Sequence, residues 1–204
     1  MRLRTLALAA TGIVLAAALW WRKNPSACPY GQRFWVEAPH PLITRDRLKE
    51  VLNPGAGDRI LEVGPGTGYY TLDVAEWIGP DGTLDIFDIQ QEMLDHSMQR
   101  ASEQGLTNLR PTRGDGRDLP FPDDFFDSAF LVTTLGEIPD QAAAVSELAR
   151  VIKPGGRLVV GELMGDPHWV SPGAIQEYGA AAGLVLESRI GPWFGSFSLL
   201  RKPS

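Results

Sequence analysis

The residues with the clearest chemical meaning form a glycine-rich turn, Gly64-x-Gly66-x-Gly68, directly after the apolar run Ile60–Val63. Glycine lets a ligand approach the backbone closely, and it adopts the positive φ angles that tight turns require. The same cluster also occurs in ordinary loops, so alone it is a weak signal. Two residues before the first glycine stands Glu62, whose carboxylate would repel a pyrophosphate and attract an ammonium group. The spacing and this acid therefore argue against the GxGxxG turn of dinucleotide sites.

Two further acids follow the next two apolar runs. Asp88 closes the run Thr83–Asp88, where a carboxylate can accept hydrogen bonds from both hydroxyls of a ribose. Asp115 and Gly116 follow the run Leu109–Arg113 and suit the amine and the edge of an adenine ring. Each acid alone is equally consistent with a solvated surface carboxylate. Three acids at the ends of successive strands predict a shared nucleoside pocket.

Short apolar runs and amphipathic stretches must position these acids. Runs rich in branched or aromatic residues lie at Arg59–Val63, Thr83–Asp88, Leu109–Arg113, Phe126–Val132, Gly156–Glu162, Leu184–Ile190 and Ser196–Arg201. Helical patterns lie at Thr71–Ile78, Gln91–Glu103, Gln141–Val151 and Ser171–Ala181. This alternation predicts an α/β fold, Rossmann-like, with a seven-stranded and mostly parallel sheet covered by helices on both faces. Only five residues separate the last two runs, so we expect them to form an antiparallel hairpin at one end of the sheet.

The chain divides into three predicted parts, of which residues 44–204 form the main domain. That domain opens with a short helix capped by Thr44 and stopped by Asn53-Pro54-Gly55. Residues 24–43 contain four prolines without helical or strand periodicity, so we interpret them as a linker and lid. Residues 1–23 form the third part.

A run of 17 uncharged residues, Thr5–Trp21, dominates residues 1–23. As a helix it would be roughly 25 Å long, which is the short end of what spans a bilayer core. The pair Trp20 and Trp21, followed by Arg22 and Lys23, is typical of a helix end at the headgroup level. These features favour an N-terminal hydrophobic helix that serves as a membrane anchor, although a cleaved signal peptide is the alternative.

Charge and cysteine content exclude several functions. The 204 residues carry a net charge of −6, and residues 1–23 carry four cations without an acid, which leaves −10 for residues 24–204. A body this acidic disfavours nucleic acid as a partner. The single cysteine, Cys28, cannot form an internal disulfide or a CxxC site, and no metal site is predicted. The sequence does not specify the oligomeric state.

The combination of motifs resembles class I S-adenosylmethionine-dependent methyltransferases, in particular the branch of quinone, lipid and small-molecule methyltransferases. The resemblance extends over about Thr44–Arg201. It rests on Glu62 with the GxGxG turn, Asp88, Gly114-Asp115, Asp118-Leu119-Pro120-Phe121, Phe126-Asp127 and Lys153-Pro154-Gly155-Gly156. The combination is specific, whereas each motif alone is not.

This resemblance implies S-adenosylmethionine as the cofactor and assigns roles to the residues that match. Glu62 and the loop of Gly64, Gly66 and Gly68 would hold the methionyl part, and Asp88 the ribose. Ile89 would cover one face of the adenine, and Asp115 with Gly116 would contact its edge.

Methyl transfer from a sulfonium is an in-line displacement, so positioning and exclusion of water are the main requirements and a general base is optional. Glu137, just after the predicted strand Phe126–Val132, is the first candidate for such a base, with a surface or helix-capping carboxylate as the alternative. In similar sequences this loop is often rich in histidine, which it is not here. His40 in the lid is a second candidate catalytic residue, with an ordinary loop histidine as the more common alternative.

The sequence thus predicts a methyltransferase for a small, hydrophobic or membrane-associated, lipid-like acceptor. Because S-adenosylmethionine is held in the cytosol, we expect a membrane-anchored protein whose catalytic domain faces the cytoplasm. The alternatives are an NAD(P)-type oxidoreductase and a non-catalytic S-adenosylmethionine-binding module. The acceptor atom, whether oxygen, nitrogen or carbon, is left open.

Overall fold

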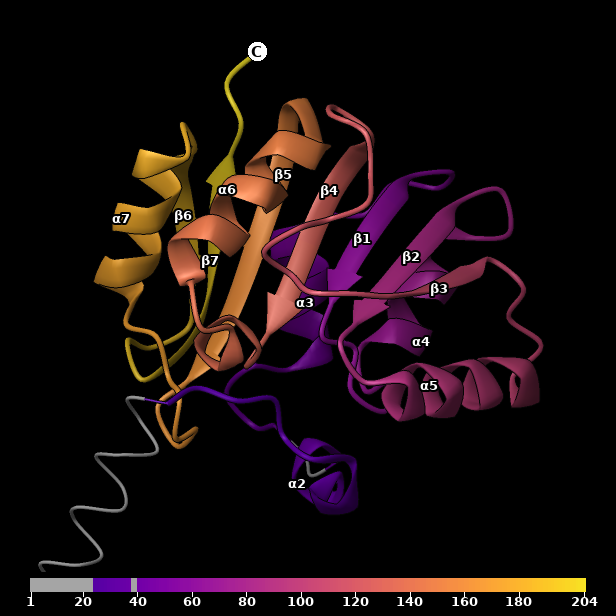
Figure 1. The fold of residues 1–204 in the computed structure, drawn as a ribbon. Helices are drawn as coiled ribbons and strands as arrows, with labels where there is room; N and C mark the ends of the chain where they lie inside the picture. Colours follow the sequence, from indigo (N-terminus) through magenta and orange to yellow (C-terminus); the bar gives the residue numbers. More distant parts are fainter. Residues whose placement is uncertain (1–23, 38–39) are drawn as a thin grey trace, which may run out of the picture.

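The computed structural model describes residues 24–37 and 40–204, which form a three-layered α/β fold (Figure 1). The predicted anchor, residues 1–23, lies outside the described residues. Within the described residues no helix has both the length and the apolar character needed to cross a bilayer.

A seven-stranded sheet in the order β3-β2-β1-β4-β5-β7-β6 forms the middle layer. The strands are β1 (Arg59–Val63), β2 (Thr83–Asp88), β3 (Leu109–Arg113), β4 (Phe126–Val132), β5 (Ile152–Leu163), β6 (Val185–Ile190) and β7 (Gly195–Arg201). Strands β1 to β5 pair in parallel, whereas β7 is antiparallel to both β5 and β6. The predicted parallel sheet with a C-terminal antiparallel hairpin is therefore confirmed.

Helices cover both faces of this sheet (Figure 1). They are α3 (Arg45–Leu52), α4 (Thr71–Ile78), α5 (Gln91–Glu103), α6 (Gln141–Val151) and α7 (Pro172–Ala181), and the 3₁₀ turn η2 (Leu135–Glu137) follows β4. The predicted cap at Thr44 is present, and the side chains of Asp140 and Ser171 likewise each accept a backbone N–H in the first turn of the helix that follows. In the predicted lid, the turn η1 (Tyr30–Gln32) and the single helical turn α2 (Phe34–Glu37) are the regular structure described.

Successive side chains along the central strands belong alternately to two apolar clusters, one on each face of the sheet. Ile60 and Ile86 belong to the cluster that α3, α4 and α5 cover, whereas their neighbours Leu61 and Phe87 belong to the cluster under α6 and α7. Because successive strand residues point to opposite faces, a strand buried on both sides appears as a continuous apolar run. This explains why the strands of the sheet centre were readily predicted.

Strand β5 begins at Ile152, four residues before the predicted start at Gly156. The sequence Lys153-Pro154-Gly155-Gly156 resembles a turn, but its backbone is paired with the C-terminal segment. Gly155 donates to the carbonyl of Lys202 at 2.9 Å, and Lys202 donates back to Gly156 at 3.0 Å. This partner is distant in sequence, so local propensity could not reveal the longer strand.

The edge formed by the amino ends of the strands is tied together by Lys202. Its ammonium group donates at 2.8 Å to the carbonyl oxygens of Ala149 and Ile152 and at 2.7 Å to Asp124. The chain then ends at Ser204, on the side of the sheet opposite the carboxyl edge (Figure 1).

Candidate active site

A cavity of about 900 Å³ lies at the carboxyl ends of the parallel strands, where α/β sheets bind ligands. The predicted site residues that line it are His40, Gly64, Gly66, Asp88, Ile89, Asp115, Gly116 and Glu137. Glu62 and Gly68 do not line it. The structure thus brings most of the predicted residues together from loops that are far apart in the sequence.

The turn after β1 requires glycine at its first position. Gly64 has a φ of +71°, and a Cβ atom there would lie 2.3 Å from Cγ2 of Thr134, the residue that leads from β4 into its loop. The Thr134 hydroxyl donates to the Val132 carbonyl at 3.0 Å and lies 3.4 Å from that of Gly64. Gly68 instead packs against Ser97 of α5, so its role is to let this helix approach.

Two buried carboxyl groups stand on the strands behind and beside this turn. Burial, with a smaller contribution from Asp88, raises the pKa of Glu62 to about 8. Burial also raises the pKa of Asp88, to about 6. Backbone N–H groups that donate to this carboxylate lower its pKa in part; one of them, that of Gln90, lies 2.8 Å from Oδ1. Oε2 of Glu62 has no hydrogen-bond partner in the part of the chain that the structure describes. Both carboxyl groups are suited to a cationic or hydroxyl-bearing ligand, which would favour their charged forms.

Asp115 is partly exposed and bound to Arg117. The guanidinium donates to both carboxylate oxygens, with distances of 2.6 to 3.2 Å, and these bonds keep the pKa of Asp115 below its usual value. Asp115 is therefore charged at neutral pH and retains its acceptor character. Across the cavity Ile89 exposes 52% of its surface, as expected for a residue that covers a flat ring.

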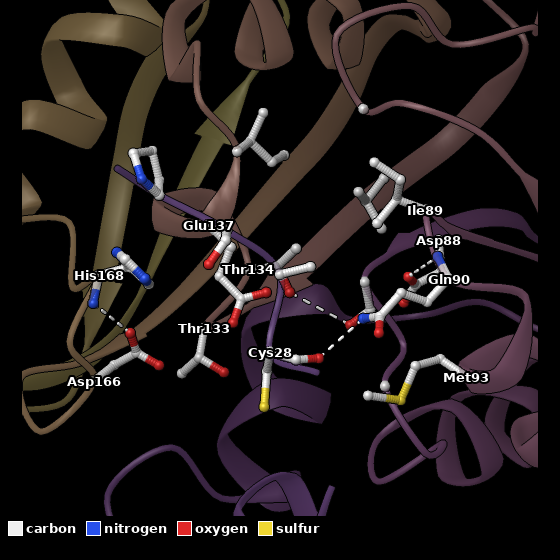
Figure 2. A pocket seen from close by; sticks show the side chains of 18 of the residues that line it. Cys28, Asp88, Ile89, Gln90, Met93, Thr133, Thr134, Glu137, Asp166 and His168 are labelled. Carbon is white, nitrogen blue, oxygen red and sulfur yellow. Dashed lines mark hydrogen bonds between the residues drawn. The ribbon is translucent and has the colours of Figure 1, made fainter. Parts of the chain in front are cut away.

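The loop after β4 carries Glu137 and is held by an unusual backbone. Thr133 has a φ of +51°, which is strained for a β-branched residue and turns the chain sharply into η2. A Cβ atom at Gly136 would lie 1.7 Å from the carbonyl oxygen of His168, so only glycine lets the loops after β4 and β5 touch. This contact brings Glu137 next to the segment that contains Asp166 and His168 (Figure 2).

Acidic groups gather on this side of the cavity. The pKa of Glu137 is raised to about 8, mainly by burial. The nearby carboxyl groups of Asp166 and Asp88 also raise this pKa, whereas a backbone hydrogen bond from Cys28 lowers it. Burial likewise raises the pKa of Asp166, whose Oδ1 accepts the His168 backbone N–H at 2.7 Å. Behind them the pKa of Glu162, on β5, is raised well above its usual value by burial. This side of the cavity therefore favours protonated carboxyl groups that can donate or accept hydrogen bonds.

His40 lines the opposite wall and packs against aromatic rings. It stacks on Tyr70 and meets Tyr69 edge-on, with centroid distances of 6.0 and 4.8 Å. Burial, followed by the charge of Arg45, lowers its pKa, so the imidazole is neutral at pH 7. Neither tyrosine lines the cavity, since Tyr70 is buried and donates to the carbonyl of Ile43 at 2.6 Å. The structure thus favours packing over cofactor contact for the two tyrosines.

A strap formed by Pro25–Pro29 crosses the cavity, as Figure 2 shows for Cys28. The side chain of Gln90 ties it down, because its amide nitrogen donates to the Cys28 carbonyl at 2.9 Å and its oxygen accepts the Tyr30 N–H at 3.2 Å. The hydroxyl of Tyr30 lies 3.0 Å from Nδ1 of His96 on α5. Residues of the segment predicted as a linker and lid thus line the cavity, and their role as a lid stays a prediction.

Sequence reasoning missed Gln90, Thr133 and Asp166 as parts of the site. Asp166 follows β5 much as Asp88 ends β2, so the rule that placed Asp88 would also have found it. No local pattern marks Gln90 or Thr133, whose importance arises from contacts between distant segments.

The sheet order, the hairpin and the glycine turn beside Asp88 are those of class I S-adenosylmethionine-dependent methyltransferases. A structure of such a methyltransferase from Aquifex aeolicus superposes with a TM-score of 0.77 at 19% identity, covering 86% of this chain and 98% of that one. Residues 39–178 match the ubiE/COQ5 methyltransferase family, and the chain therefore belongs to that family. Membership in a methyltransferase family removes the oxidoreductase alternative.

Two curated relatives are similar over part of their length. A demethylmenaquinone methyltransferase from a Geobacillus species is 33% identical over 118 residues, which are 58% of this chain and 50% of that protein. The ubiquinone/menaquinone biosynthesis C-methyltransferase UbiE of Stutzerimonas stutzeri is 36% identical over 105 residues, 51% of this chain and 41% of that protein. The chain spans about half the length of the curated relatives it matches.

The residues present fit S-adenosylmethionine, the cofactor of this family. The turn at Gly64 leaves no room for a side chain, and Asp88, which lines the cavity, lacks a positively charged partner among the interactions described. A ligand with an ammonium group and a ribose would supply the missing partners.

Proposed function

We propose that this chain transfers a methyl group from S-adenosylmethionine to a hydroxylated aromatic acceptor of the quinone type. The observation that carries the proposal is that one cavity contains both a nucleoside-binding wall, with Asp88 and Asp115, and a buried acid, Glu137, on the facing loop. The names of the curated relatives support a quinone-type acceptor.

The donor half of the cavity would be formed by residues of β1, β2 and the loop after β3. Asp88 would accept hydrogen bonds from the ribose, the backbone at Gly64 would border the methionyl part, and Ile89 would cover the adenine. When bound, S-adenosylmethionine supplies an electrophilic methyl group. The strap over the cavity would exclude water from the reacting groups.

On the acceptor side Glu137 would accept the proton of the acceptor hydroxyl. A phenolic hydroxyl has a pKa near 10 in water, so a carboxyl group with a pKa of about 8 is much better matched to it than an ordinary glutamate. Loss of this proton places negative charge on the ring and makes a ring carbon nucleophilic. The apolar lining residues Ile138 and Leu163 are suited to contact the ring.

The location of the protein is part of the same proposal. The apolar run Thr5–Trp21 would anchor the chain in a membrane, with the catalytic domain in the cytoplasm where the cofactor is made. Such an anchor would bring the site to a lipid-soluble acceptor.

The experiment is to incubate the full chain with S-adenosylmethionine that carries a deuterated methyl group and with a prenylated, ring-demethylated naphthoquinol in vesicles. Mass spectrometry should detect the deuterated methyl group on a ring carbon. Glu137→Gln should abolish most of this product while S-adenosylhomocysteine still binds, whereas Glu187→Gln, an exposed acid on β6, should leave the product unchanged. Binding of S-adenosylhomocysteine without product from either the naphthoquinol or membrane lipid extracts would favour a non-catalytic binding module.

A further inference from the structure

Large exposed apolar side chains are concentrated on one edge of the molecule. Among the described residues they are Phe34, Ile89, Met164, Val185, Trp193 and Phe194. Strand topology places Ile89, Met164, Trp193 and Phe194 at the carboxyl edge of the sheet, and α2 with Phe34 lies beyond that edge (Figure 1). Val185 alone lies at the opposite edge, where it pairs with Arg201.

Three of these side chains, together with the partly exposed Trp169, form a continuous surface, which we call the edge patch and define as Met164, Trp169, Trp193 and Phe194. The backbone N–H of Met164 donates to the carbonyl of Phe194 at 2.8 Å, which joins the end of β5 to the β6–β7 turn. The ring of Trp193 lies 5.6 Å from that of Phe194 and 6.4 Å from that of Trp169. Met164 and Trp193 expose 50% and 55% of their surfaces, so the described part of the chain leaves much of the patch uncovered.

The first described residues of the chain lie beside this patch. Pro25, two residues after Lys23, lines a second cavity of about 220 Å³ together with Trp169. In the sequence, the 17 uncharged residues of Thr5–Trp21 end four residues before Pro25, which shares this cavity with Trp169 of the edge patch. The apolar run Thr5–Trp21 and the exposed aromatic rings of the edge patch both favour an apolar environment. One apolar partner that contacts both would satisfy them together.

Charge decides which kind of lipid surface fits. Residues 24–204 carry a net charge of −10, so headgroups with a net negative charge would repel this part of the chain as a whole. Tryptophan combines an apolar ring with a polar N–H and is enriched at the membrane interface. The composition of the patch therefore suits zwitterionic phospholipid.

We propose that the edge patch inserts into the interface of a phospholipid bilayer and orients the carboxyl edge of the sheet toward the membrane. The mouth of the large cavity then faces the lipid, because Leu163, Gly165 and Asp166 line that cavity on either side of Met164. This inference concerns a surface and holds whichever acceptor is methylated.

The test places a fluorescent thiol label on full-length protein in vesicles of zwitterionic phosphatidylcholine brominated on its acyl chains. In a Cys28→Ser background, Met164→Cys carries the label in the patch and Val185→Cys carries it at the opposite edge, with similar exposure. Bromine should quench the label at position 164 strongly and leave that at 185 unchanged relative to unbrominated vesicles. Adding Trp193→Ser and Phe194→Ser should relieve the quenching at 164, whereas binding of S-adenosylhomocysteine should persist and show that the domain is folded.

The other results each overturn the proposal. Equal quenching at both positions would show that the domain has no preferred orientation on the bilayer. An unquenched label at 164 that forms disulfides between unlabelled Met164→Cys chains would show that a second copy covers the patch. An unquenched label without such disulfides would show that the patch is covered by residues 1–23 or left in water.

Discussion

The side-chain amide of Gln90 donates to the backbone carbonyl of Cys28 at 2.9 Å and thereby ties a segment from the start of the chain to the cavity. Gln90 stands two residues after Asp88, the last residue of β2, so one short stretch both lines the nucleoside wall and fastens the strap above it. This arrangement couples access to the cavity with the residues that would hold the cofactor.

Gln90→Ala should loosen the strap and expose Cys28. The variant loses two hydrogen bonds to the strap, which are worth about 1 kcal/mol each, so we expect Cys28 to react with a maleimide roughly tenfold faster or more. Because Cys28 is the only cysteine, mass spectrometry of the whole protein gives the rate directly. Gln91→Ala, which removes only an exposed contact to Asp95, is the matched control and should react at the wild-type rate. Equal rates for the two variants would contradict the role given to Gln90.

Asp88→Asn should weaken binding of S-adenosylhomocysteine. A charged acceptor that binds two ribose hydroxyls contributes about 1.5 to 3 kcal/mol, so the dissociation constant measured by calorimetry should rise roughly 10- to 100-fold. Asp85→Asn is the control, because Asp85 is buried in the same strand but does not line the cavity. If the two variants bind equally well, the ribose is held elsewhere.

The methylation rate should depend on pH through Glu137. A base acts in its deprotonated form, and the pKa of this carboxyl is raised by burial to about 8, so the rate should increase with pH and level off above about pH 8. In Glu137→Gln the remaining activity should lose this dependence. A wild-type profile that is already level at pH 6 would exclude Glu137 as the base.

Gly64→Ala should lower the free energy of unfolding by more than the cost of placing alanine at a positive φ angle, because the added Cβ atom also clashes with Thr134. The added Cβ atom would lie 2.3 Å from Cγ2 of Thr134, and φ is +71°. Gly57→Ala is the control, since Gly57 has a φ of +86° with no atom within 4 Å of the added Cβ. We expect a loss of about 1 kcal/mol in the free energy of unfolding for the control and roughly 3 kcal/mol for Gly64→Ala, measured by urea denaturation. Equal losses would show that Thr134 moves aside freely.

The sequence was sufficient to predict the strands, the hairpin and the carboxyl edge as the place of the site. Continuous apolar runs predict buried strands such as β1 and β4, and the GxGxG turn indicates where β1 ends. Glu137 was placed near the cavity because it follows β4 by only a few residues. In each case the signal is local in the chain.

The features that the sequence did not predict depend on contacts across the chain. The longer β5 needs its pairing with Lys202, and the approach of Glu137 to Asp166 needs the contact between Gly136 and His168. Glu62 was predicted to hold the cofactor, and this stays a prediction; its side chain is buried and does not line the cavity. Spacing along a strand does not reveal how far a side chain lies from a ligand surface.

The attachment of Lys202 to the amino edge has a practical consequence for handling the protein. Its ammonium group binds the carbonyl oxygens of Ala149 and Ile152, and Ser204 lies on the side of the sheet away from the cavity (Figure 1). An affinity tag or a surface linker fused after Ser204 would leave ligands free to enter, whereas a fusion joined near Asn24 would crowd the strap. Immobilised binding assays and sensor designs should therefore use the C-terminal end.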